Sequence, residues 1–276
     1  MRAFISLTKS RQFLILSIAA SLAFVHVSLA WAADDTNLLF NSLIFWPAAF
    51  VLCKEVDPPR APSSGWVYLG VGILLTTLVS GVLVKGDFLY LYPFLVGIGS
   101  VITLAGLSGS GKYWKPLTLL FVLGVPEILM FALINPAPLT ARFADIILWY
   151  TGYDVVLDGV WLHLPGGSVE VNQACSGLRA MTRLLGMAVL ALLCLPRRWT
   201  LGQVVMLPVI SIVIAFLSNS IRVALLAILK ATNRPAAFDS LHGGSTSQLF
   251  SIASIVLLMG VVWLLIQYPS AEGEPN

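Results

Sequence analysis

The sequence predicts an all-α membrane protein, a polytopic bundle of about eight transmembrane helices. The chain is 58% hydrophobic and only 11% charged, whereas an ordinary soluble domain is about 25% charged. Its apolar runs approach the roughly 20 residues that a helix needs to cross a bilayer, and its basic residues lie in short loops between these runs. We therefore expect residues 1–276 to form a single integral membrane domain with lipid as its main solvent.

Eight apolar runs are long enough to be considered as spans, although the second is short. The seventh could continue into the apolar stretch Val223–Leu229. The expected spans are 12–31, 38–53, 65–84, 88–107, 116–134, 174–195, 200–220 and 246–267.

The first span, 12–31, also resembles a secretory signal, because basic residues precede it and Ala30-Trp31-Ala32 follows the pattern of a cleavage site. The alternative is an uncleaved helix with Trp31 at the membrane interface. The long apolar core favours the uncleaved helix, and the orientation of the later helices is the same in both cases.

The charges of the loops alternate along the chain and predict the topology. Basic residues concentrate in cytoplasmic loops, so we expect both termini in the cytoplasm of a multi-pass protein. The loops assigned to the cytoplasm carry Arg2, Lys9, Arg11, Lys54, Arg60, Lys112, Lys115, Arg197 and Arg198. Those assigned to the outer side carry Asp34, Asp35, Lys85, Asp87, Arg142, Asp145, Asp154 and Asp158.

The longest segment outside the spans, 135–173, is expected on the outer side. Apolar and polar residues alternate in Val160–Leu164 and again in Ser168–Val171, and Pro165-Gly166-Gly167 separates the two runs. This pattern predicts a small extracytoplasmic β-hairpin just before the sixth helix. His163 falls within the alternation, so we expect a structural role for it.

The segment Asn172–Arg179 holds the first candidate for chemistry. Cys175 is expected at or near the N-terminus of the sixth helix, where unpaired N–H groups and the helix dipole favour a thiolate. Arg179 would lie one turn further on the same helix face. A thiolate beside a cation suits nucleophilic catalysis, with Ser176 as a supporting neighbour.

Two further candidates are expected at the same membrane depth as Cys175. Arg222, with Asn219 nearby, lies about 33 Å along a helix that begins on the cytoplasmic side near Thr200. His242 precedes the eighth span, again on the outer side. A thiolate, an imidazole that carries protons and a guanidinium that stabilises an oxyanion form a set suited to acyl transfer.

These features together resemble the exosortase/archaeosortase family of bacterial and archaeal membrane enzymes. The resemblance rests on about eight spans, the hairpin, the boxes Ala174–Leu178 and Asn219–Arg222, and the late His242. The approach Ser168–Val171 resembles the cyanobacterial branch. Family members often have an acidic residue two positions before the cysteine, where this chain has Gln173.

The resemblance implies roles for three residues and a class of substrate. Cys175 would be the nucleophile, with Arg222 and His242 as its partners, in a cysteine protease or transpeptidase of the bacterial plasma membrane. Substrates would be exported proteins that end in a Pro-Glu-Pro-type motif, a transmembrane helix and a basic cluster. The enzyme would cut near the motif on the extracytoplasmic side and transfer the protein to an amine or glycolipid acceptor.

Ionisable residues inside spans point to function or to pairing. We expect Glu127 in the fifth span to pair with Arg183 or Arg179 in the sixth. The run Gly106–Lys112 matches a nucleotide-binding loop, but it joins two apolar spans and has Tyr113 where the magnesium-binding Ser or Thr would stand.

No residue spacing suggests a metal or an organic cofactor, and nothing suggests a nucleic-acid partner, so membrane lipid and the substrate are the expected partners. Two other classes of protein stay open. Glu127, Arg179 and Arg183 could line the path of a transporter, although the sequence shows no inverted repeat. A scaffold that helps assemble a secretion or polysaccharide complex is the third possibility.

Overall fold

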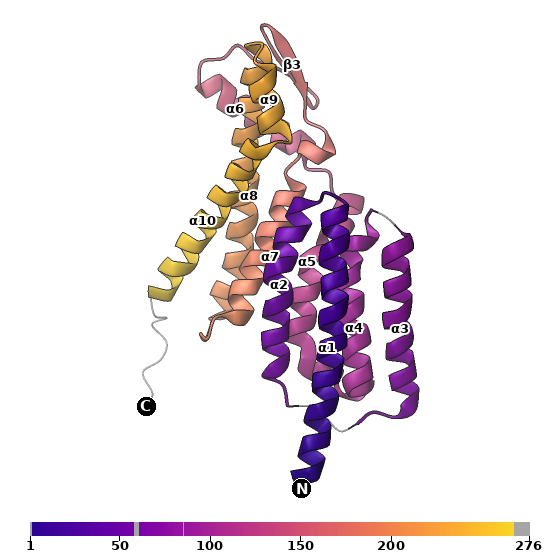
Figure 1. The fold of residues 1–276 in the computed structure, drawn as a ribbon. Helices are drawn as coiled ribbons and strands as arrows, with labels where there is room; N and C mark the ends of the chain where they lie inside the picture. The colour runs from indigo at the N-terminus through magenta and orange to yellow at the C-terminus, as the bar shows by residue number, and fades with distance from the viewer. Residues whose placement is uncertain (1, 58–60, 85, 268–276) are drawn as a thin grey trace, which may run out of the picture. The chain divides into compact units, whose positions relative to one another are not determined.

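The computed structural model describes residues 2–57, 61–84 and 86–267, which form helices and one small sheet (Figure 1). The chain divides into two compact units, Met1–Ile128 and Leu129–Asn276. Among the described residues, seven helical segments are long and apolar enough to cross a membrane. The predicted fold class is confirmed, while the single-domain organisation and the orientation stay predictions. Arg60 and Lys85, two of the charges used for the orientation, lie outside the described residues.

The first unit contains four helices and most of a fifth. Its core forms where Ala19, Trp46 and Tyr92 meet from three of these helices. His26 is fully buried there and stacks on Tyr92 at 5.4 Å, so this histidine is a packing residue of the core. The helices are α1 (Arg2–Ala32), α2 (Thr36–Lys54), α3 (Ser64–Leu83), α4 (Phe88–Gly109) and α5 (Trp114–Leu133).

The junction of α4 and α5 explains why eight predicted spans correspond to seven segments. The segment Phe88–Leu133 is 46 residues long and contains both predicted spans. Gly106 has non-helical backbone angles (φ 61°), and the 3-10 turn η1 (Ser110–Tyr113) links the two helices. The run that resembles a nucleotide-binding loop therefore joins two helices, as expected.

The second unit begins with α6 (Ala137–Tyr150) and an antiparallel sheet of order β1-β2-β3. The predicted hairpin is confirmed as β2 (Trp161–Leu164) and β3 (Gly167–Glu170). The strand β1 (Val156–Asp158) is an addition that the sequence pattern did not reveal.

Small and apolar residues repeat along one face of α6 at helical spacing, and this face packs on the sheet and on α8 (Leu201–Ala231). The buried leucines of β2 contribute to the same core. The members of the core from α6 and β2 are Ala137, Ala141, Ala144, Leu148, Leu162 and Leu164.

The helix α8 is longer than the predicted seventh span of 200–220. Thr200 and Gln203 form a capping box that starts the helix, and it continues through the apolar stretch 223–229 to Ala231. Its 31 residues correspond to about 46 Å, more than the roughly 30 Å of a bilayer core. Arg222 thus lies inside the helix and not at its end.

Two other boundaries also differ from the predictions. The predicted sixth span started at residue 174, whereas α7 (Leu178–Cys194) starts four residues later, after the 3-10 turn η2 (Gln173–Cys175). The short helix α9 (Pro235–His242) was not predicted. The last span is confirmed as α10 (Ser245–Gln267), and α8 packs against α6, α7, α9 and α10.

Candidate active site

Cys175 lies in a tight turn and not in the helix that follows it. The side chain of Asn172 accepts a hydrogen bond from the backbone N–H of Cys175 at 3.0 Å and caps η2. Gly177 then takes a left-handed conformation with φ 84°, which favours glycine, and α7 starts after it. We call residues 172–178 the cysteine turn.

The left-handed break at Gly177 makes the predicted helical relation between Cys175 and Arg179 wrong. Arg179 belongs to the first turn of α7, whereas Cys175 precedes that helix. The exposed guanidinium of Arg179 lies over the ring of Phe131 at 5.2 Å. Arg179 therefore packs on an aromatic ring near the end of α5, and its predicted support of the thiolate has no helical basis.

Three side-chain hydrogen bonds connect the cysteine turn to other elements of its unit. In two of them the donor lies outside the turn and the acceptor is a backbone carbonyl of the turn. The hydrogen bonds run from Asn219 Nδ2 to the carbonyl of Cys175 (2.9 Å), from Thr140 Oγ1 to the carbonyl of Ser176 (2.8 Å), and from Gln173 Nε2 to the carbonyl of Phe131 (2.7 Å). The turn is thus held by α8, α6 and the end of α5. The amide of Gln173 can donate the third bond. An ionised carboxylate, from the acidic residue that exosortase/archaeosortase family members often have at this position, could not donate it.

Close packing against α8 adds to these bonds. A Cβ atom on Gly177 would lie 2.7 Å from the side chain of Asn219, so a larger residue would displace one of them. Ser176 is fully buried, and its hydroxyl donates to the carbonyl of Gln173 at 2.6 Å inside the turn. Asn219 and Ser176, both expected to support the site, shape the backbone around Cys175.

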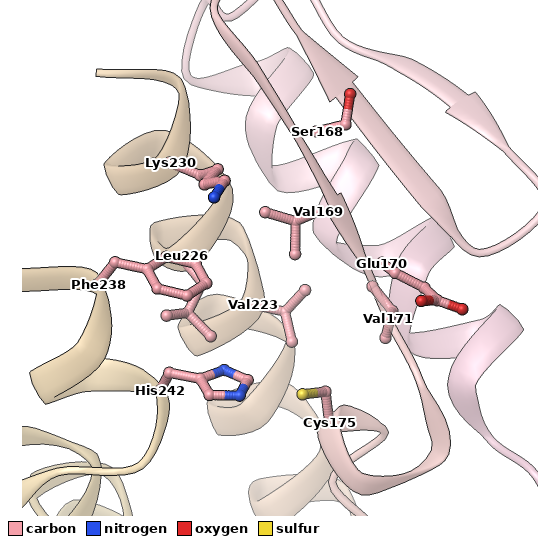
Figure 2. Close-up of a pocket in the computed structure, with 10 residues that line it drawn as sticks. All are labelled: Ser168, Val169, Glu170, Val171, Cys175, Val223, Leu226, Lys230, Phe238 and His242. Atoms are coloured by element: carbon pink, nitrogen blue, oxygen red, sulfur yellow. The ribbon is translucent and has the colours of Figure 1, made fainter. Parts of the chain in front are cut away.

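Cys175 and His242 line one pocket of about 170 Å³. Figure 2 shows the sulfur of Cys175 and the imidazole of His242 pointing toward each other from opposite walls. Cys175 is only 7% exposed and belongs to the hydrophobic core of its unit, so the pocket is where its thiol becomes accessible. The other lining residues are Ser168, Val169, Glu170, Val171, Val223, Leu226, Lys230 and Phe238.

Arg222 supplies a positive charge next to this pocket. It precedes the lining residue Val223 on α8 and interacts electrostatically with Cys175. Its Nε atom is buried and has no hydrogen-bond partner among the described residues. Such a donor, held near the thiol of Cys175, can stabilise negative charge that develops on a reacting carbonyl.

His242 is the last residue of α9 and is exposed. Its ring stacks on that of Phe238, one turn earlier, with centroids 5.4 Å apart and an interplanar angle of 9°. The structure therefore brings Cys175, Arg222 and His242 together from η2, α8 and α9.

Other predicted residues lie outside this group. Glu127 is buried in the first unit, whereas Arg183 and Arg179 belong to the second, so their pairing stays a prediction. His163 hydrogen-bonds to Ser168 at 2.7 Å within the sheet, which agrees with the structural role expected for it.

Four residues of the site were missed in the sequence. Asn172 carried a usable signal, because asparagine is a preferred N-cap before a helical turn. Thr140, Lys230 and Phe238 carried none, since each is far from Cys175 in the chain and joins the site only through α6, α8 and α9.

The described side chains contain no group of three or more His, Cys, Asp and Glu residues that could hold a metal ion. The arrangement found here is that of a thiol, an imidazole and a cation around a pocket, which can support attack on a carbonyl and transfer of an acyl group.

Comparison with known proteins identifies the family of this chain. The sequence model of a family described as Transmembrane exosortase (Exosortase_EpsH) matches residues 31–259. That range contains all the residues described above at the pocket, although it does not distinguish branches, so the cyanobacterial likeness stays a prediction. No curated protein and no solved structure matches the chain. The chain belongs to the transmembrane exosortase family.

Proposed function

We propose that this protein is a membrane-embedded cysteine transpeptidase or protease that cleaves the C-terminal sorting tails of exported proteins. One observation carries the proposal: the thiol of Cys175 faces the imidazole of His242 across a pocket, and Arg222 lies next to the lining residue Val223 on α8. These three groups supply a nucleophile, a proton carrier and an oxyanion stabiliser.

In the first half of the reaction, His242 accepts the proton of the Cys175 thiol, and the sulfur attacks the carbonyl carbon of the scissile peptide. The carbonyl oxygen becomes negative, and Arg222 stabilises it. The C–N bond then breaks. His242 gives its proton to the departing amine, which leaves with the tail, and a thioester joins the substrate to Cys175.

In the second half, a nucleophile resolves the thioester. An amine, a glycolipid or water gives a proton to His242 as it attacks the acyl carbon, and the C–S bond breaks. The proton returns to the sulfur of Cys175, so the enzyme is restored. With an amine or a glycolipid the reaction is a transfer, and with water it is hydrolysis.

The position of the site suits a substrate that has its own membrane helix. Arg222 lies about 32 Å along α8 from Leu201, about one bilayer core from the end that we place in the cytoplasm. The pocket then opens at the extracytoplasmic interface. The substrate's transmembrane helix can dock from the lipid, while its Pro-Glu-Pro-type motif reaches Cys175.

Substitution of Cys175 by alanine tests this proposal directly. The test uses a secreted reporter that carries such a tripartite tail and is expressed together with the full-length protein. We expect Cys175→Ala to leave the tail uncut, because no other described residue of the pocket replaces the thiol. The matched control is Cys194→Ala at an exposed cysteine near the end of α7, which should process the reporter at the normal rate.

The same experiment separates the three classes of protein left open by the sequence. A transporter or an assembly scaffold would not depend on the thiol of Cys175. If Cys175→Ala cuts the reporter as fast as the unchanged protein, at equal abundance in the membrane, the enzyme proposal is wrong.

A further inference from the structure

The pocket extends well beyond the reacting groups along one face of α8. Val223, Leu226 and Lys230 line it at helical spacings of three and four residues. Val223 lies beside Cys175 in the same core, and Lys230 follows seven residues later, which is about 10 Å along the helix. Figure 2 shows Lys230 at the end of the pocket opposite Cys175 and His242.

The opposite wall is the edge strand β3. Within the described residues, β3 pairs with β2 alone, and residues 168–171 line the pocket. The N–H of Val171 bonds to the carbonyl of Val160 on the β2 side, so the backbone groups of the neighbouring Glu170 point to the open edge, because they alternate along a strand. An extended peptide can pair its own backbone with this open edge.

Both walls of the pocket, α8 and β3, extend from Lys230 at one end to Cys175 at the other. A Cβ atom on Gly167, at the start of β3, would lie 3.1 Å from the side chain of Lys230. At its other end the strand leads through Val171 into the cysteine turn. At about 3.3 Å per residue, a strand covers the distance of about 10 Å in three residues.

The end of the pocket at Lys230 carries a positive charge. Lys230 is exposed, its ammonium lies over the ring of Phe238 at 5.6 Å, and no described carboxylate forms an ion pair with it. Glu170 also lines the pocket, but Figure 2 shows its carboxylate on the far side of β3 from Lys230. The same Phe238 ring stacks on His242, so one aromatic side chain supports both the cation and the imidazole.

We propose that Lys230 is a specificity-determining residue that binds an acidic side chain of the substrate about three residues from the scissile carbonyl. This inference rests on the proposed function. An acidic side chain there would pair with the ammonium of Lys230 while the peptide lies extended along β3, and a basic side chain would be repelled.

A charge exchange tests the inference. Reporters carry tails with Pro-Glu-Pro, Pro-Gln-Pro or Pro-Lys-Pro in the motif, and initial rates of processing are measured with the unchanged protein and with Lys230→Glu, Lys230→Met and Arg234→Glu. Arg234 is the matched control, because it is exposed, lies four residues further and does not line the pocket.

We expect the unchanged protein to process the Glu tail about tenfold faster than the Lys tail, since a like charge facing Lys230 replaces an attractive pair. Lys230→Glu should reverse this preference, and Arg234→Glu should keep it. Lys230→Met should reduce the preference to about threefold or less, the effect expected once the local charge is gone.

Two kinds of result would overturn the inference. The first kind is a result in which Lys230 has no special effect. Either the unchanged protein processes Glu and Lys tails equally, or Arg234→Glu changes the preference as much as Lys230→Glu does. The second kind is a Lys230→Glu variant that still processes the Glu tail faster than the Lys tail, as the unchanged protein does. If Lys230→Glu is inactive on all tails, Lys230→Met is the deciding variant. A Lys230→Met variant that still processes the Glu tail about tenfold faster than the Lys tail contradicts the inference. Failure of the proposed function looks different, because Cys175→Ala would then process every tail.

Discussion

The two sides of the pocket are built in different ways. The cysteine turn is buried and is held by hydrogen bonds from three other parts of its unit. His242 stands on the opposite side at the end of an eight-residue helix, where it is exposed and stacks on Phe238. Cys175, the proposed nucleophile, is therefore fixed in position, whereas His242, the proposed proton carrier, depends on a small surface element.

This difference separates stability from activity. A buried hydrogen bond that is lost costs about 1–3 kcal/mol, so substitutions around the cysteine turn should lower both the free energy of unfolding and the rate of processing. Substitutions on α9 should affect mainly the rate, because most surface changes alter stability by less than about 0.5 kcal/mol. The four predictions below test this separation.

The largest effect is expected from Gly177→Ala. The left-handed conformation costs a non-glycine residue about 1–2 kcal/mol, and the new Cβ would lie 2.7 Å from Asn219, which adds about 1–3 kcal/mol of overpacking. We expect a loss of about 3 kcal/mol in the free energy of unfolding in detergent, together with loss of processing. Gly152→Ala is the control, because Gly152 has φ 85° and nothing within 4 Å of its Cβ position. Equal losses for the two variants would show that the contact with Asn219 has no influence.

Asn219→Leu should have the next largest effect. It removes the donor to the carbonyl of Cys175 and leaves that buried oxygen unpaired, at a cost of about 2 kcal/mol. Processing should fall at least as steeply as stability, because the oxygen belongs to Cys175, the proposed nucleophile. The control is Ser220→Ala, whose hydroxyl bonds only within α8, to the carbonyl of Phe216. Normal rate and stability in Asn219→Leu would refute the role of this bond.

Thr140→Val tests the contact from α6. The two side chains have nearly the same shape, but valine cannot donate to the carbonyl of Ser176. We expect a loss of about 1 kcal/mol in the free energy of unfolding. Thr151→Val offers the same chemical change just after the end of α6, where the hydroxyl bonds only to the carbonyls of Ile147 and Leu148 in the last turn of that helix. The comparison fails if the exposed position proves as sensitive as the buried one.

The smallest effect on stability is expected from Phe238→Leu. The ring that stacks on His242 is lost, so the rate of processing should fall about threefold, while the free energy of unfolding changes by less than about 0.5 kcal/mol. Phe143→Leu is matched to it, because Phe143 packs on Phe216 at 4.9 Å away from the pocket residues. A large loss of stability in Phe238→Leu would show that α9 is as rigidly built as the cysteine turn.

Most of the architecture could be predicted from the sequence. Span length and apolarity are local properties, and a bilayer makes them decisive, because a backbone in lipid must satisfy its own hydrogen bonds. The hairpin followed from strict alternation around Pro165-Gly166-Gly167. Cys175, Arg222 and His242 were predicted to act together because their residue types and order along the chain suit acyl transfer.

By itself, then, the sequence determined a multi-pass helical protein and its hairpin, and it suggested three groups suited to acyl transfer. The tertiary structure alone decided that the sixth helix starts after Gly177, that Arg222 lies inside α8, and that α9 carries His242 to the pocket. It also brought Thr140 and Lys230 to the site. These features depend on contacts between residues far apart in the chain, and such contacts leave no periodic pattern in the sequence.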